Sequence, residues 1–307
     1  MISTLPQLSS CGQELDTSPE AFGELRDSSD VAHDFNALRE RMAEDGYLYV
    51  PGYLNRAEVL EARHHIVTRL AADGHIDTSH PIMDAVATPG TGVNFEPHLA
   101  NNNEALMKVL YDGPMMEFYA GFLGEEVLHF DFTWLRAVAP GAGTPAHLDV
   151  VYMGRGTKNL FTAWTTLGDT PLDLGGLMIL ENSHRQERIK NGYGTKDVDA
   201  FCENRVGSDY TGMGGGGNIS HGGWLSKNPR KLRENLGGRW LTAPEFRAGD
   251  LLTFSMFTIH ASLDNKSDRI RISSDSRYQR ASEPADERWI GPNPIGHGPA
   301  GKRAMIC

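Results

Sequence analysis

The first third of the chain carries apolar residues at helical spacing. The pattern over residues 35–45 predicts a helix that ends at Gly46, because glycine readily takes the left-handed backbone found after a helix C-terminus. Asn55, followed three positions later by Glu58, is a capping-box pattern that predicts the start of a second helix. A further helix is expected over residues 103–124.

Beyond residue 125 the pattern changes to short apolar runs separated by Gly, Pro and Asp. Many short strands with turn residues between them predict a sandwich or barrel rather than alternating strands and helices. The runs that read as strands are residues 127–139, 146–153, 159–167, 175–180, 250–260 and 268–278.

These patterns predict a mainly β protein with flanking helices. We expect a helical part over residues 31–125, a β core over residues 126–280 and a tail over residues 281–307. A long glycine-rich insert, residues 185–247, interrupts the β core. Residues 1–30 are Ser-rich, acidic and without periodicity, so a flexible N-terminal arm is expected there.

Composition restricts the class of partner. The 29 Lys and Arg against 40 Asp and Glu give a net charge of −11, which argues against nucleic acid or an anionic membrane as the main partner. The N-terminus lacks a signal-peptide pattern, and no apolar run reaches the roughly 18 residues of a membrane span. Three widely spaced cysteines indicate reduced thiols. We therefore expect a cytoplasmic protein.

His147 and Asp149 stand two apart in the β-like run of residues 146–153. Alternation along a strand would place both side chains on one face, and a carboxylate among apolar residues needs a partner. His260 ends a second apolar run, far along the chain. Each histidine alone would more often be an ordinary hydrogen-bonded core residue. Two histidines and one carboxylate together suit non-haem Fe(II), whereas zinc sites more often use three histidines or add cysteine.

A possible anchor for an anionic cosubstrate follows the distal histidine. Arg269 and Arg271 lie on the next predicted strand, and a guanidinium offers paired donors to a carboxylate. The two arginines share one face of that strand, so alternation does not choose between them.

Several segments together resemble the phytanoyl-CoA dioxygenase-like family of Fe(II)/2-oxoglutarate oxygenases. They occur in consistent order between about residues 34 and 278. The segments are FNALRERMAEDGYLYVPGYL, TPAHLDV, AWTTLGD, GGLMILENSH and HASLDNKSDRIR. The resemblance implies a double-stranded β-helix with N-terminal helices, in one oxygenase domain over residues 31–307.

The resemblance also implies the cofactors and their ligands. Fe(II), 2-oxoglutarate and O2 would be used, with iron held by His147, Asp149 and His260. Arg271, eleven residues after the distal histidine, and Ser262 would hold the far carboxylate of 2-oxoglutarate. The cosubstrate pocket would be lined by Trp164 and Leu135. Arg269 then becomes a structural arginine.

The same resemblance implies the reaction. A C–H bond of a small metabolite would be hydroxylated, with release of succinate and CO2. Desaturation, cyclisation or demethylation would use the same residues and stay open, as does the oligomeric state. Asn182-Ser183-His184 departs from the Gly-Ser-His that is usual in the family, and His184 is expected to be structural rather than a fourth ligand.

The insert is expected to reach over the mouth of the barrel, since long loops on rigid scaffolds often carry binding residues. The glycine-rich stretch of residues 212–218 lacks the Lys-Ser/Thr of a phosphate loop and is interpreted as a hinge or lid. Solvent-exposed surface is the alternative interpretation for most of the residues that could contact substrate. These candidates are Arg136, Arg185, Lys190, Tyr193 and Arg205.

Two other functions remain as alternatives at this stage. One is a cupin-like metal-dependent isomerase or lyase that uses the same three ligands without 2-oxoglutarate. The other is a non-catalytic metal-binding barrel. Succinate formation from 2-oxoglutarate separates the oxygenase from both.

Overall fold

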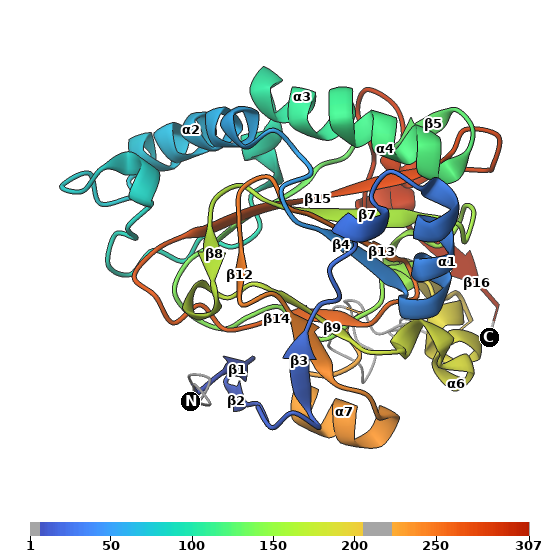
Figure 1. Ribbon diagram of the computed structural model, residues 1–307. Helices are drawn as coiled ribbons and strands as arrows, with labels where there is room; N and C mark the ends of the chain where they lie inside the picture. Colours follow the sequence, from blue (N-terminus) through green and yellow to red (C-terminus); the bar gives the residue numbers. More distant parts are fainter. Residues whose placement is uncertain (1–6, 205–222, 307) are drawn as a thin grey trace.

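Two facing β-sheets form the centre of the computed structural model, which describes residues 7–204 and 223–306 (Figure 1). The six-stranded major sheet has the order β4-β13-β7-β15-β5, with β6 also paired to β15, and all its pairs are antiparallel. Its strands are β4 (Tyr47–Val50), β5 (Val127–His129), β6 (Trp134–Val138), β7 (Phe161–Thr166), β13 (Leu251–Ser255) and β15 (Arg271–Arg280).

The four-stranded minor sheet has the order β14-β9-β11-β3. Its strands are β3 (Phe22–Glu24), β9 (Leu177–Leu180), β11 (Trp240–Thr242) and β14 (His260–Ser262). Three short pairs complete the β structure: β1 (Ser9–Ser10) with β2 (Gln13–Glu14), β8 (Thr170–Pro171) with β12 (Glu245–Phe246), and β10 (Ala200–Cys202) with β16 (Arg303–Met305). Mainly β architecture with flanking helices, as a double-stranded β-helix, is confirmed.

Alternation along β13 explains how the two layers of core form. Leu252 and Phe254 point between the sheets and pack with Trp164 and Ile179, whereas Leu251 belongs to the core under the helices. Residues two apart share a face of a strand, so one apolar strand serves both layers.

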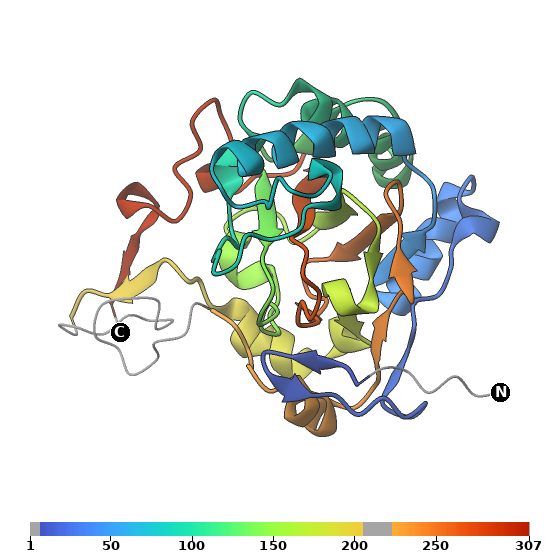
Figure 2. The same ribbon diagram turned by 90° about the vertical axis from the view of Figure 1, so that its left-hand side faces the viewer.

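The helices cover the outer face of the major sheet. Figures 1 and 2 show α2, α3 and α4 lying across it, and the core beneath them contains buried Val59, Ile66, Leu106 and Phe118. The helices are α1 (Phe35–Asp45), α2 (Arg56–Ala72), α3 (Glu104–Tyr111), α4 (Gly113–Leu123), α5 (Val150–Met153), α6 (Glu187–Asn191) and α7 (Pro229–Leu236).

The predicted ends of the first two helices are confirmed. Gly46 takes the left-handed backbone (φ 79°) after α1, and the side chain of Asn55 accepts hydrogen bonds from the first backbone N–H groups of α2. The single helix expected over residues 103–124 is wrong, because it divides at Asp112 into α3 and α4. Pro114 lacks an N–H and cannot continue α3, but it fits the first turn of α4.

The N-terminal segment differs from the flexible arm expected. From residue 7 it packs on the sandwich: β3 pairs in parallel with β11, and the Ser10 hydroxyl donates to the carbonyl of Ser262 over 2.8 Å. Because these bonds are made to the backbone, the Ser-rich composition gave no sign of them.

The insert is shorter than predicted. Its last residues, from Trp240, form β11 of the minor sheet, while α6, β10 and α7 lie before it. Residues 212–218, interpreted as a hinge or lid, lie outside the described residues. Cys202 is disulfide-bonded, so the expectation of reduced thiols is wrong there, whereas Cys11 is free. Among the described residues, no helix is long and apolar enough to cross a membrane.

Replacing Gly46 by alanine is expected to lower the free energy of unfolding by about 2 kcal/mol. A Cβ atom at this position would lie 2.3 Å from Nδ1 of His184, and the backbone is left-handed. Gly52→Ala is the matched control, because Gly52 has a similar φ of 65° but nothing within 4 Å of its Cβ position. Urea unfolding should show a clearly larger loss for Gly46→Ala, and equal losses would contradict the packing argument.

Candidate active site

A cavity of about 300 Å³ lies between the two sheets. Strands β6, β7, β14 and β15 line it, together with the loop of residues 144–153. His147, Asp149 and His260 are among the residues that line this cavity.

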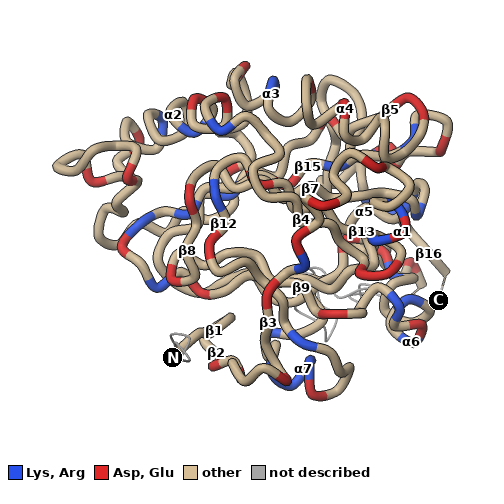
Figure 3. The backbone as a smooth tube through the Cα atoms, viewed as in Figure 1, with Lys and Arg blue, Asp and Glu red and all other residues tan. Residues whose placement is uncertain are grey.

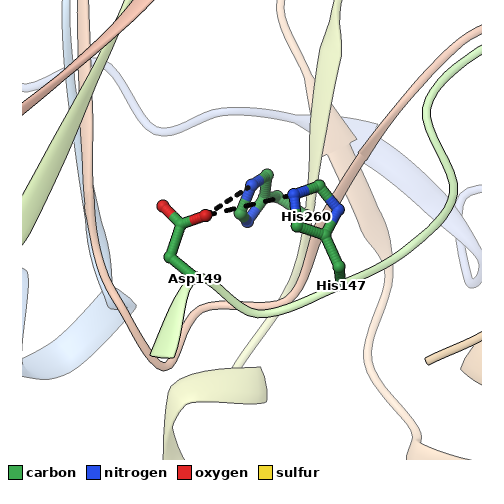
Figure 4. Close-up of side chains that lie close together, drawn as sticks. All are labelled: His147, Asp149 and His260. Atoms are coloured by element: carbon green, nitrogen blue, oxygen red, sulfur yellow. Dashed lines mark ion pairs between the residues drawn. The ribbon is translucent and has the colours of Figure 1, made fainter. Parts of the chain in front are cut away.

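These three side chains converge on one point (Figure 4). Oδ1 of Asp149 lies 4.0 Å from Nε2 of His147 and 3.8 Å from Nε2 of His260, and one donor atom from each residue lies within 4.8 Å of the others. Among the described residues, this is the group of His, Cys, Asp and Glu side chains that is arranged to hold a metal ion.

The backbone brings the three together differently from the two long strands expected. His147 forms an isolated antiparallel bridge with His260, and Asp149 is already helical (φ −68°, ψ −28°) and leads into α5. On the distal side, β13 ends at Ser255, a turn follows, and His260 begins β14 in the other sheet. The predicted strand over residues 146–153 is therefore wrong, and the one over residues 250–260 is correct only for β13 (Leu251–Ser255), although the predicted meeting of the side chains is confirmed.

Backbone carbonyls fix which nitrogen of each imidazole faces the metal position. Nδ1 of His147 donates to the carbonyl of Pro145 over 2.8 Å, and Nδ1 of His260 donates to the carbonyl of Thr258 over 3.0 Å. A carbonyl only accepts, so both Nε2 atoms are left with a free lone pair. Burial and the neighbouring His260 lower the pKa of His147 to about 3, which keeps that imidazole neutral.

The second oxygen of Asp149 is held by residues that the sequence analysis missed. Oδ2 accepts a hydrogen bond of 2.5 Å from the Thr162 hydroxyl and lies 3.2 Å from Nη2 of Arg277. Burial alone would raise the pKa of Asp149, but the Arg277 guanidinium holds it below its usual range. Strand alternation offered a signal for Arg277, because it lies on the same face of β15 as Arg271.

Thr162→Val is expected to weaken Fe(II) binding by about ten- to hundredfold, since the hydroxyl fixes the ligating carboxylate. Thr165→Val is the matched control, because its buried hydroxyl on the same strand has no hydrogen-bond partner among the described residues. Anaerobic metal titration measures the difference. Equal affinities in the two variants would show that the Thr162 hydroxyl does not support the ligand.

Arg271 lies deep in the same cavity and lacks a carboxylate partner among the described residues. The residue is 2% exposed, its Nη1 donates to the Ser273 hydroxyl over 2.8 Å, and its Nε has no partner in the described part of the chain. Burial lowers the pKa of Arg271 to about 10, so the group remains charged at neutral pH. Arg269 is exposed and lies 3.9 Å from Asp268. The structure thus separates two arginines that alternation left equivalent.

The predicted lining of the cosubstrate pocket is partly wrong. Ser262 and Trp164 line the cavity, and the Ser262 hydroxyl accepts from the N–H of Thr144, which leaves its own proton for a further acceptor. Leu135 points to the opposite face of β6, into the core under the helices, while Trp134 and Arg136 point into the cavity. The prediction placed Leu135 on the cavity face of the strand, but alternation gives that face to the residues on either side of it.

Of the residues predicted to contact substrate, Arg136 lines the cavity. Arg185 donates to the carbonyl of Ala43, Lys190 pairs with Glu187, and Tyr193 packs on an apolar cluster, so none of the three lines it. Arg205 lies outside the described residues. Nε2 of His184 donates to the same Ala43 carbonyl, and His184 is not part of the metal group, which agrees with a structural role.

The donor set fits the metal centre of a non-haem iron oxygenase. Two imidazoles and one carboxylate leave coordination positions open for a cosubstrate and oxygen. The buried, unpaired Arg271 in the same cavity suits the far carboxylate of a dicarboxylate. Fold and site together define the class of Fe(II)/2-oxoglutarate-dependent oxygenases.

Comparison with known families agrees with this class. Residues 42–273 match the model of the phytanoyl-CoA dioxygenase (PhyH) family, and the chain belongs to that family. It is an Fe(II)- and 2-oxoglutarate-dependent oxygenase of small molecules.

Relatives and solved structures show the same relationship. The chain is 26% identical to the 1-deoxypentalenic acid 11-beta-hydroxylase of Streptomyces exfoliatus, over 86% of this chain and 87% of that protein. The fold is similar to that of iron-bound EctD from S. alaskensis (16% identity, 97% and 98% coverage, TM-score 0.55). It is also similar to the epimerase SnoN from nogalamycin biosynthesis, in complex with Fe3+, alpha ketoglutarate and nogalamycin RO (18% identity, 86% and 94% coverage, TM-score 0.53).

Proposed function

We propose that His147, Asp149 and His260 hold the iron and that Arg271 and Ser262 hold the far carboxylate of 2-oxoglutarate. The observation that carries this assignment is the buried guanidinium of Arg271, which is charged and without a carboxylate partner in the cavity of the metal group. An uncompensated buried charge is costly, so it marks a place where an anion binds.

Each residue then has a defined task. When bound, iron and 2-oxoglutarate would activate O2 as the oxidant, with release of succinate and CO2. The Pro145 and Thr258 carbonyls hold the two imidazoles, and Thr162 and Arg277 hold Asp149. The Arg271 guanidinium lies over the ring of Trp164, 5.9 Å from the centre of that ring. The indole helps to exclude water from the anion site.

Hydroxylation is the outcome that we propose for the bound metabolite. Support comes from the similarity over most of both chains to a protein named as a hydroxylase. The solved structures of similar fold include an epimerase and a carbocyclase, so the fold alone does not select the outcome. Arg271 and family membership speak against a cupin-like isomerase and a non-catalytic barrel.

We propose further that the protein works in the cytoplasm on a small-molecule substrate and without nucleic-acid or membrane partners. Figure 3 shows acidic and basic residues interspersed along the described chain rather than gathered into one basic face. The cytoplasm contains the 2-oxoglutarate that the enzyme uses as its cosubstrate. The disulfide at Cys202 is unusual in that compartment, so fractionation is best paired with thiol titration of the purified protein.

The function is tested by succinate production. Protein loaded anaerobically with Fe(II) is given 2-oxoglutarate, oxygen and fractions of a metabolite extract, and succinate is measured beside the mass of new products. We expect iron-dependent succinate that one fraction stimulates, with a product heavier by one oxygen atom. Stimulated succinate without an oxygenated product would point to another outcome, and no succinate with bound iron would contradict the oxygenase.

A further inference from the structure

Two polar side chains outside the metal group line the same cavity, and a buried carboxylate holds each of them. Nε of Arg136 lies 3.1 Å from Oδ2 of Asp275, and Nδ1 of His297 lies 2.7 Å from Oδ2 of Asp199. His297 lies beyond residues 42–273, which match the family model, so the family resemblance does not account for it.

The pair of His297 and Asp199 is rigidly held. The Asp199 side chain is 0% exposed and also accepts from Nη1 of Arg288 over 2.6 Å and from Nζ of Lys302 over 2.9 Å. A carboxylate in this setting accepts from Nδ1–H of His297 and fixes the orientation of the ring. Nε2, on the opposite edge of that ring, then carries the free lone pair and can accept a hydrogen bond.

Arg136, also in the cavity lining, is held in the same manner. Asp275 engages Nε, and the guanidinium lies 5.4 Å from the ring centre of Phe95. Phe95 is 44% exposed, which is unusual for a large aromatic residue, and it also lines the cavity. An exposed aromatic ring beside a charged guanidinium suits a ligand with an apolar body and a charged end.

The charge of the cavity indicates the sign of that end. The described lining residues carry a net charge of one positive unit, because they include three arginines and two aspartates. The arginines are Arg136, Arg271 and Arg277, and the aspartates are Asp149 and Asp275. Fe(II) and the dianion 2-oxoglutarate cancel each other, so the loaded cavity keeps this excess. A monoanion neutralises it, whereas a cation would add to it.

The rest of the lining is aromatic or apolar. Trp134, Tyr152, Met153 and Trp224 complete the wall near His297, and the rings of Tyr152 and His297 lie 6.0 Å apart. The apolar wall removes the body of a ligand from water, and the polar pair orients it, as in most small-molecule sites.

We propose that the substrate is a small apolar molecule with a single carboxylate, which Arg136 binds within the cavity beside His297. This inference rests on the proposed function and names the substrate class of the same site. Arg136 supplies the charge and paired N–H donors, and Nε2 of His297, which carries the lone pair, is left to accept from a donor group elsewhere on the molecule. The carboxylate thereby fixes which C–H bonds of the apolar body face the iron position.

The test uses straight-chain probes on the holoenzyme without oxygen. Iron and 2-oxoglutarate form a coloured chelate, whose visible absorption changes when a substrate-like molecule enters beside it. Saturated carboxylic acids of four to twelve carbons are titrated beside the alcohol and the amine of equal length. We expect at least one acid to change the band with an affinity at least tenfold above that of its alcohol and amine.

Variants of Arg136 locate the binding. Arg136→Gln should weaken the acid by about ten- to hundredfold, with the alcohol unchanged. Arg136→Lys should restore part of the loss. Arg269→Gln is the matched control, because its side chain is 57% exposed and outside the cavity, and it should leave acid binding unchanged.

The outcomes separate this inference from the proposed function. Absence of the chelate band contradicts the oxygenase assignment itself. A normal band with no preference for any acid, or a preference that survives Arg136→Gln, overturns the carboxylate site. Loss of the band on adding an acid shows displacement of 2-oxoglutarate from Arg271 and overturns it as well.

Discussion

Arg271→Leu is expected to remove 2-oxoglutarate binding while making the cofactor-free protein no less stable. The guanidinium is buried and charged, and no carboxylate of residues 7–204 or 223–306 pairs with it, so it costs folding free energy until the cosubstrate arrives. A leucine avoids that cost but offers nothing to the anion. The apparent KM for 2-oxoglutarate should rise by a hundredfold or more, since charge-assisted hydrogen bonds are lost in a water-poor site.

Arg269→Leu provides the matched comparison, because the same change falls two residues away on an exposed side chain. It should leave the KM near that of the wild type. Thermal unfolding of both variants is measured without iron and 2-oxoglutarate. A strongly destabilised Arg271→Leu protein that still binds 2-oxoglutarate would show that the arginine is structural.

Asp149→Ala is expected to reduce succinate formation below about one percent and to weaken Fe(II) binding by more than a hundredfold. The change removes the anionic ligand and leaves Arg277 buried without the carboxylate that it contacts. Anaerobic metal titration separates this effect from a loss of turnover alone.

The control for Asp149→Ala is Asp268→Ala, at an aspartate whose side chain is 80% exposed. It should bind iron like the wild type. An Asp149→Ala protein that folds, binds one iron with wild-type affinity and makes succinate would contradict the ligand assignment.

Residue chemistry carried the sequence prediction further than secondary structure did. His147, Asp149 and His260 meet as expected, although neither predicted strand exists in full. A ligand set depends on which side chains converge. The strand boundaries, in contrast, depend on tertiary contacts, such as the bond from Thr258 to the carbonyl of Gly46, that no local pattern reveals.

Most errors of the sequence prediction have two causes: the face of a strand on which a residue lies, and contacts between residues far apart in the sequence. Leu135 is one residue out of phase with the cavity, a difference that the strand pattern of residues 127–139 does not resolve. Asp199 and His297 lie 98 residues apart, and their contact depends on the pairing of β10 with β16. The N-terminal strands likewise bind partners more than two hundred residues away, so local composition did not indicate them.

A crystal structure of the anaerobic complex with Fe(II) and 2-oxoglutarate tests the central assignment most directly. The account predicts one iron about 2 Å from Nε2 of His147, Nε2 of His260 and Oδ1 of Asp149. It also predicts the far carboxylate of 2-oxoglutarate on the guanidinium of Arg271. Iron bound elsewhere, or 2-oxoglutarate anchored on another arginine such as Arg136, would contradict it.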